Sequence, residues 1–277
     1  MKKFILEIFA VTMLVFLFCG CAEQTNKHSS DTTLIQTTDT LSFPLEKGSG
    51  MPAVLFLQTD PNGHEYMVFR DHFRKPRIFV YDLEDPSDGP KTIHFHNEGP
   101  NGTGASTTGF FMRSWDEIYL PNTSIREISV IDSSGVLKRV IRYGDDNEPD
   151  KAVPTSSVTN KLFLFFEDKM FCYQQANRHK GDKMLTESPV DLILDLKDGS
   201  VTPSPLCYPS EQVIHPDKIE KFGLVAHSSR CLVGDKIVYS FWYGHDLHVF
   251  DIKTGKITKK TAKSRYLPDE QALSPYN

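Results

Sequence analysis

Short apolar runs separated by turn residues dominate the chain from residue 51 onward. The runs are rich in Val, Ile, Phe and Tyr, and Gly, Asp, Asn, Ser and Pro stand between them. No long window in this region places apolar residues at the helical spacing of about 3.6 residues. The pattern is typical of β-strands joined by turns, and it predicts an all-β domain.

Four stretches repeat one plan: a strand, a polar gap, a second strand that ends in Asp, a turn with Gly, and a third strand. The stretches are Glu65–Phe95, Glu117–Ile141, Lys161–Thr202 and Lys236–Thr258. Their turn aspartates are Asp82, Asp132, Asp195 and Asp251, so the plan recurs after 50, 63 and 56 residues. Asp accepts hydrogen bonds from backbone N–H groups of its own turn, and Gly supplies the positive φ that the reversal needs. In the third stretch, Lys169–Tyr173 is expected to add an extra hairpin.

The repeat length favours a β-propeller, because propeller blades have four strands and run about 40–50 residues each. A blade cannot bury both of its faces alone, so neighbouring blades must stack face to face. A β-sandwich is the alternative, and it predicts an even strand spacing of about 8–12 residues instead of a long period. We expect a β-propeller of four-stranded meander blades, with four to five recognisable blades in residues 43–277.

The N-terminus has the plan of a lipoprotein signal peptide. Two lysines follow Met1, and Ile8–Phe18 is a run of 11 residues that are apolar except for Thr12. A membrane-spanning helix needs roughly 20 apolar residues, so this run fits the apolar core of a signal peptide instead. The run leads into Phe18-Cys19-Gly20-Cys21, which resembles the lipobox of bacterial lipoproteins. This resemblance implies cleavage between Gly20 and Cys21 and attachment of lipid, palmitate included, to the Cys21 thiol. A plain secretory signal, with Cys21 incidental, is the alternative.

The chain therefore divides into a signal peptide (1–20), a lipid-anchored flexible linker (21–42) and the propeller domain (43–277). Ala22–Thr40 is rich in Ser, Thr, Gln and Asp, and has little to bury, so it suits a flexible tether. The triplets Asp31-Thr32-Thr33 and Asp39-Thr40-Leu41 resemble acceptors for O-glycans in some Gram-negative bacteria. A polar linker without glycans is the simpler interpretation, and we favour it.

Charge and cysteine content restrict the partners. The formal net charge is −5, and loss of two lysines and one glutamate with the signal peptide makes it −6. An acidic chain lacks the basic surface that nucleic acids require, so we expect no nucleic-acid partner. Three cysteines remain beyond Cys21, namely Cys172, Cys207 and Cys231. They can form at most one disulfide, their spacing does not match a zinc site, and we interpret all three mainly as buried apolar residues.

The lipobox, the linker and strands such as Leu247–Ile257 together resemble the TolB-like, six-bladed β-propeller lipoproteins of Gram-negative bacteria. Many members of that group are known only as domains of unknown function. Six blades of about 56 residues would exceed the chain after the linker, so the resemblance implies a shortened member with an incomplete ring. Leu41–Leu45 is then expected to form an outer strand that helps to close the ring.

One set of loops is the best candidate for a ligand-binding face. The gap between the first two strands of the first stretch carries Arg70 and Arg74, and the equivalent gap in the fourth carries Trp242, Tyr243 and His245. In a propeller these gaps fall on the same face. Arg, Trp, Tyr and His together suit a peptide, a glycan or another extended partner. Polar loops without a binding role are the simpler interpretation of the same residues.

The sequence contains no recognisable catalytic signature. Neither a Gly-x-Ser-x-Gly nor a His-Glu-x-x-His motif is present, and Gly99–Gly104 lacks the Lys and the helix of a phosphate-binding loop. His94 and His96 share one face of a strand, but no third metal ligand is evident nearby. We therefore expect no catalytic residue, no metal ligand and no cofactor.

These features predict a cell-envelope lipoprotein, held by its N-terminal lipid to a membrane that we expect to be the outer one, on either its periplasmic or its surface face. Its propeller is expected to bind a protein, peptide or glycan partner without catalysis. The alternative is a propeller hydrolase or lyase with a metal-assisted site in the central funnel. The enzyme requires His, Asp or Glu side chains of several blades to converge on one point.

Overall fold

The computed structural model describes residues 42–45, 47–50, 54–60, 62–71, 75–104, 109–143, 161–174, 186–209, 228–241 and 245–262. The predicted signal peptide (1–20), Cys21 and the predicted linker up to residue 41 lie outside these ranges. Apart from one short 3₁₀ helix, η1 (Pro86–Asp88), the regular structure within them is β-strand. No helix among the described residues has the length and apolar character of a membrane span.

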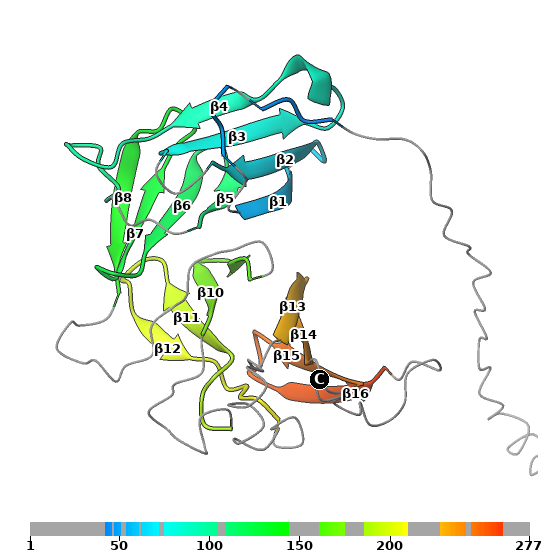
Figure 1. Cartoon of the computed structure of the whole chain (residues 1–277). Helices are drawn as coiled ribbons and strands as arrows, with labels where there is room; N and C mark the ends of the chain where they lie inside the picture. The colour runs from blue at the N-terminus through cyan, green and yellow to red at the C-terminus, as the bar shows by residue number, and fades with distance from the viewer. Residues whose placement is uncertain are drawn as a thin grey trace, which may run out of the picture. The chain divides into compact units, whose positions relative to one another are not determined.

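The strands form four antiparallel sheets, and in each sheet four strands that follow one another along the chain lie side by side (Figure 1). The first blade contains β1 (Val54–Thr59), β2 (Glu65–Arg70), β3 (Arg77–Asp82) and β4 (Lys91–His94). The second contains β5 (Phe111–Ser114), β6 (Glu117–Asn122), β7 (Glu127–Ile131) and β8 (Leu137–Arg142). The third contains β9 (Leu164–Phe166), β10 (Lys169–Tyr173), β11 (Asp191–Asp195) and β12 (Val201–Pro203). The fourth contains β13 (Ser228–Val233), β14 (Lys236–Phe241), β15 (Asp246–Asp251) and β16 (Ile257–Thr261).

This architecture confirms the predicted β-propeller of four-stranded meander blades, and the described residues form four of them. Lys169–Tyr173, expected to add an extra hairpin to the third stretch, is β10. It pairs with β9, and these are the first two strands of the third blade. Ser42–Leu45 is not a strand, so the outer strand expected at Leu41–Leu45 is wrong for the described part of that segment. Instead, Phe43 packs edge-on against the ring of Tyr81 in β3, with 5.3 Å between ring centroids.

The turns between third and fourth strands form as the sequence predicts. Each turn aspartate accepts a hydrogen bond from a backbone N–H two or three residues later, at 2.8–2.9 Å. The glycine of each turn has a positive φ, between 71° and 86°. The Asp side chain and the Gly backbone thus close the same reversal in all four blades.

Buried side chains from consecutive blades interlock in three apolar cores. Neighbouring residues of a strand point to opposite faces of its sheet. In β6, for example, Ile118 and Leu120 pack with the first blade, whereas Tyr119 packs with the third. Phe171 and Tyr239 contribute to the core between the third and fourth blades in the same way. The other face of the first blade carries Phe69, Phe79 and Tyr81, and Phe43 packs against them.

Two of the turn glycines also contact the backbone of the preceding blade. A Cβ built on Gly135 would stand 1.7 Å from the His94 carbonyl oxygen at the end of β4. A Cβ on Gly199 would stand 2.3 Å from the Arg142 carbonyl oxygen at the end of β8. The glycine is thus required both for its positive φ and for the close approach of two blades.

Candidate functional site

Buried polar side chains occupy one repeated position at the ends of the second strands. Arg70, Asn122 and Gln174 each stand five residues after the first residue of β2, β6 and β10. Their exposed fractions are only 1%, 3% and 2%. Phe241 takes this position in the fourth blade. The four residues stand where the chain enters the connections that the sequence analysis selected as a binding face.

Arg70 joins two blades instead of projecting into solvent. Its guanidinium donates a hydrogen bond of 2.9 Å to the carbonyl oxygen of Gly109, which precedes β5, and stands 5.3 Å from the centroid of the Phe95 ring. Burial lowers the pKa of Arg70 to about 10. The sequence predicts Arg70 on a ligand-binding face, but its side chain is buried between two blades, so this placement is corrected.

Asn122 and Gln174 place amide oxygens in the interior. Asn122 Oδ1 and Gln174 Oε1 are buried, and neither accepts a hydrogen bond from any part of the chain that the structure describes. The Asn122 amide nitrogen lies so close to Gly104 that a Cβ there would be 2.7 Å from it. A buried acceptor without a donor costs about 1–3 kcal/mol, so each of these oxygens marks a place where a water or ligand donor would be stabilising.

The remaining residues of the predicted face are only partly visible. Arg74, Trp242 and Tyr243 lie outside the described residues, as do Gly20 and Cys21 of the predicted lipidation site. His245 is half-buried, and its carbonyl oxygen accepts a hydrogen bond of 2.7 Å from Ala262 N. The proximity of Arg74, Trp242, Tyr243 and His245 stays a prediction.

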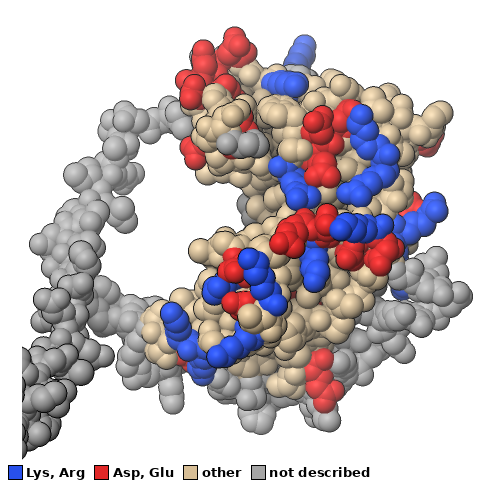
Figure 2. All heavy atoms as spheres, turned by 180° about the vertical axis from the view of Figure 1, so that it is seen from behind, with Lys and Arg blue, Asp and Glu red and all other residues tan. Residues whose placement is uncertain are grey.

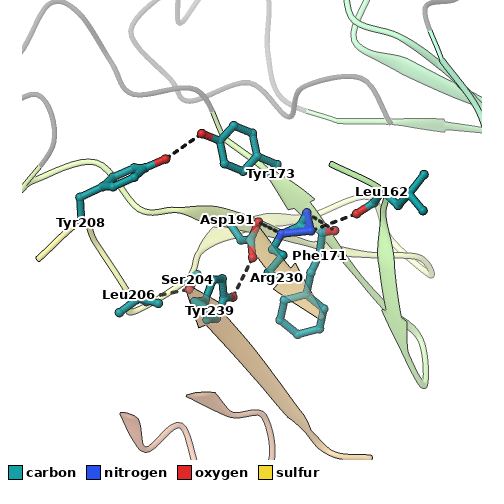
Figure 3. A network of polar contacts seen from close by, with 9 residues as sticks. All are labelled: Leu162, Phe171, Tyr173, Asp191, Ser204, Leu206, Tyr208, Arg230 and Tyr239. Atoms are coloured by element: carbon teal, nitrogen blue, oxygen red, sulfur yellow. Dashed lines mark hydrogen bonds and ion pairs between the residues drawn. The ribbon is translucent and has the colours of Figure 1, made fainter. Parts of the chain in front are cut away.

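A buried ionic network joins the third and fourth blades at the start of β11 (Figure 3). Arg230 in β13 donates to Asp191 Oδ1 through Nε at 2.8 Å, and Tyr239 in β14 donates to Asp191 Oδ2 at 2.7 Å. The Arg230 guanidinium also donates to the carbonyl oxygens of Leu162 and Phe171, at 3.0 and 3.4 Å. The Asp191 and Arg230 side chains are 0% and 4% exposed, so the pair is almost fully removed from water.

The electrostatics of this network suit a structural clamp. Burial raises the pKa of Asp191, whereas the Arg230 charge acts in the opposite direction. Burial and the neighbouring Asp191 raise the pKa of Tyr239 well above its ordinary value, so the phenol keeps its proton and acts as a donor. Beside it, the hydroxyls of Tyr173 and Tyr208 share a buried hydrogen bond of 2.7 Å. The network fixes the fourth blade on the third, and the sequence analysis missed it because Asp191 and Arg230 are 39 residues apart.

Among the described histidines and cysteines, the His64 group and Cys231 differ from what the sequence predicts. His94 and His96 are exposed, as expected for a partly exposed strand face. A group that the sequence analysis did not select, His64 with Asp82 and Glu84, brings three potential metal-ligand atoms within 4.8 Å of one another. It belongs to one blade, whereas the enzyme alternative requires several blades to converge. None of Cys172, Cys207 and Cys231 forms a disulfide, and Cys231 is exposed, which corrects its interpretation as a buried residue.

Comparisons with known proteins give a family and a fold. A family model described as "Domain of unknown function (DUF4221)" matches residues 25–274. No curated protein matches the chain. A crystal structure of a DUF4221 member from Bacteroides vulgatus is similar, with 22% sequence identity and a TM-score of 0.65. The match covers 82% of this chain and 63% of that one, so the chain spans less than two thirds of that protein's length.

More distant propellers resemble the chain only weakly. A streptogramin B lyase matches with 9% identity and a TM-score of 0.41, covering 80% of this chain and 72% of the lyase. A putative 6-phosphogluconolactonase from Bacteroides fragilis matches with 12% identity and a TM-score of 0.37, covering 80% and 57%. Both values are too low to relate the chemistry of those proteins to this chain.

Proposed function

The chain belongs to the DUF4221 family of domains of unknown function, and from this membership and its N-terminal sequence we propose that it is a lipid-anchored binding protein of the cell envelope. In this proposal, Cys21 carries the lipid, residues 22–42 form a tether, and the propeller binds a protein, peptide or glycan without catalysis. The apolar run followed by Phe18-Cys19-Gly20-Cys21 supports the anchor. We place the anchor in the outer membrane, in accordance with the resemblance to TolB-like lipoproteins.

The observation that carries the binding role is the pair of buried amide oxygens below one set of connections. Asn122 Oδ1 and Gln174 Oε1 occupy equivalent positions in adjacent blades, and no described group donates to either. The protein retains two acceptors that its own described residues leave unused, at a cost of about 1–3 kcal/mol each. We propose that a partner rich in N–H or O–H groups, as peptides and glycans are, satisfies these buried oxygens through bridging water molecules.

Aromatic residues in the fourth blade provide the rest of the proposed contact. The connection after Phe241 contains Trp242, Tyr243 and His245 in sequence, and the equivalent connection of the first blade contains Arg74. Trp, Tyr and Arg are the residue types that most often dominate binding energy at interfaces. We propose that these side chains contact the partner, whereas Arg70, which is buried, supports the blade below them.

The experiment is a comparison of partner capture by matched variants of the full-length lipoprotein. Cells producing the wild-type chain, Trp242→Ala/His245→Ala or Lys256→Ala are treated with a cross-linker, and co-purified material is quantified by mass spectrometry. Lys256 is exposed in the turn at the other end of the same blade, so its variant controls for surface changes alone. We expect at least one partner to fall about tenfold or more with Trp242→Ala/His245→Ala and to be unchanged with Lys256→Ala. Equal capture by all three proteins would contradict the proposed face.

A further inference from the structure

In each blade, the residue just before the second strand lies at one corner with the turn aspartate at the end of the third strand. In three of the four blades both residues are aspartates, and a lysine balances their negative charge. The pairs are Asp116 with Asp132, Asp168 with Asp195, and Asp235 with Asp251. A lysine contacts each pair: Lys138 lies 2.8 Å from Asp132, Lys197 lies 2.6 Å from Asp168, and Lys236 lies 2.7 Å from Asp235 and 3.1 Å from Asp251. In the fourth blade, Lys253 also lies 3.6 Å from Asp235. The second aspartate of each pair also raises the pKa of its lysine.

The first blade departs from this plan. His64 stands at the position before β2, where the other blades have Asp, and Asp82 is the turn aspartate. Glu84, two residues further on, joins them. His64 Nε2 lies 2.8 Å from Asp82 Oδ1, and His64 Nδ1 lies 3.5 Å from Glu84 Oε1. The corner thus contains an imidazole and two carboxylates where the other blades have two carboxylates and an ammonium group.

Apart from His64 itself, the described charged groups that act on this corner are carboxylates. The carboxylates of Asp82, Glu84 and Asp60 are the charged groups that raise the pKa of His64, and the same three raise the pKa of Tyr66. Lys91, on the neighbouring strand β4, holds its ammonium 4.2 Å from the centroid of the Trp115 ring instead. Figure 2 shows a group of acidic side chains at the end where the first blade lies in Figure 1, with basic side chains beside it, and both kinds of side chain over the rest of that face. Among the described residues, the positive charge that acts against these carboxylates is that of protonated His64 itself, and a bound divalent cation would replace that proton.

We propose that His64, Asp82 and Glu84 bind a divalent transition-metal ion, Zn²⁺ or Mn²⁺, whose remaining coordination positions are filled by water. Their potential ligand atoms lie within 4.8 Å of one another. One imidazole nitrogen with two carboxylate oxygens is a donor set that both ions accept, whereas Ca²⁺ and Mg²⁺ prefer oxygen ligands alone. The three side chains are 26%, 45% and 79% exposed, so an ion can enter from solution.

Local contacts prepare two of the three ligands. The His64 ring packs against Tyr66 with 4.7 Å between centroids, and the His64 backbone N–H donates to Asp60 Oδ1 at 3.0 Å. Asp82 Oδ1 accepts the Glu84 backbone N–H at 2.8 Å, which brings the second carboxylate next to the first. Only the exposed Glu84 side chain must then become ordered on binding. An ion here would tie the start of β2 to the end of β3.

The test measures Mn²⁺ and Zn²⁺ binding to the purified full chain in detergent, by electron paramagnetic resonance for Mn²⁺ and by calorimetry for Zn²⁺. Mn²⁺ is included because the exposed Cys231 thiol attracts zinc more than manganese. The variants are His64→Gln and Glu84→Gln, and the latter removes an exposed carboxylate whose loss leaves the Asp82 turn bond in place. Asp168→Asn is the matched control at the same corner of the third blade, and His94→Ala/His96→Ala removes the competing exposed pair.

We expect one saturable site, and a loss of affinity of about tenfold or more in both His64→Gln and Glu84→Gln. Asp168→Asn and His94→Ala/His96→Ala should bind as the wild-type chain does. The proposal is overturned if the wild-type chain shows no saturable site for either ion, or if Glu84→Gln retains wild-type affinity. It is equally overturned if His94→Ala/His96→Ala is the variant that loses the site.

Discussion

Replacing Gly135 with Ala should destabilise the protein far more than the same change at Gly255. Both glycines close the turn between the third and fourth strands of a blade, and both have positive φ values, 77° and 71°. They differ in their surroundings. A Cβ at Gly135 would stand 1.7 Å from the His94 carbonyl oxygen, whereas a Cβ at Gly255 meets nothing within 4 Å. The comparison therefore separates the cost of the backbone conformation from the cost of the contact between blades.

The magnitudes follow from these two terms. An Ala in the left-handed region costs about 1–2 kcal/mol relative to Gly, and both variants carry this cost. In Gly135→Ala, the His94 carbonyl must also retreat by more than an ångström. Overpacking of this kind costs about 1–3 kcal/mol. We expect a loss in unfolding free energy of about 1–2 kcal/mol for Gly255→Ala, and of about 2–5 kcal/mol for Gly135→Ala.

Urea and thermal unfolding of both variants beside the wild-type chain measure this difference. For a domain of this size, each 1 kcal/mol shifts Tm by roughly 2–4 °C, so the two variants should be well resolved. Gly199→Ala should behave like Gly135→Ala, because its Cβ would stand 2.3 Å from the Arg142 carbonyl oxygen. Equal destabilisation by Gly135→Ala and Gly255→Ala would refute the close packing of the first two blades.

Two further predictions concern charged groups. Arg230→Met leaves the buried Asp191 without its guanidinium partner, so we expect the free energy of unfolding in urea to fall by about 3–5 kcal/mol. The double variant Asp191→Asn/Arg230→Met should recover most of this loss. A loss below about 1 kcal/mol in Arg230→Met would contradict the clamp. Backbone and side-chain hydrogen bonds from Thr254, with Lys236, lower the pKa of Asp251 to about 2. A carboxyl whose folded pKa is depressed contributes stability above its unfolded pKa of about 4 and loses that stability as the pH falls through the folded value. Asp251→Asn should therefore show a flatter decline in unfolding free energy from about pH 4 to about pH 2, and an unchanged slope would count against this assignment.

The propeller could be predicted because its turn chemistry is local. Each Asp and Gly acts within a few residues of the chain, so the period of the turns is visible in the sequence. The first strands of three blades, β1, β5 and β13, were missed, although β1 ends at a turn of the same chemistry, in which Asp60 accepts the Asn62 N–H and Gly63 has a φ of 84°. Phe111–Ser114, for example, has only four residues and a register shift against β6, which weakens its alternation of polar and apolar positions.

The candidate site was harder to predict because its contacts are distant in sequence. An Arg beside a polar loop is ordinarily exposed, and only the Gly109 carbonyl, 39 residues away, explains why Arg70 is buried. The same separation concealed the Asp191–Arg230 pair. His64 could have been recognised from the repeat itself, since the other three blades have Asp at its position. Comparing equivalent positions between blades is the signal that a scan for motifs does not contain.

The most direct test of the central claim is the chemical state of the mature N-terminus. The protein is isolated from native membranes, digested, and its N-terminal peptide identified by mass spectrometry, with Cys21→Ala as the control. We predict a chain that begins at Cys21 with lipid on the thiol, and release of Cys21→Ala from the membrane fraction. An unmodified Cys21, or a Cys21→Ala chain that stays with the membrane to the same extent as the wild type, would contradict a lipid-anchored propeller.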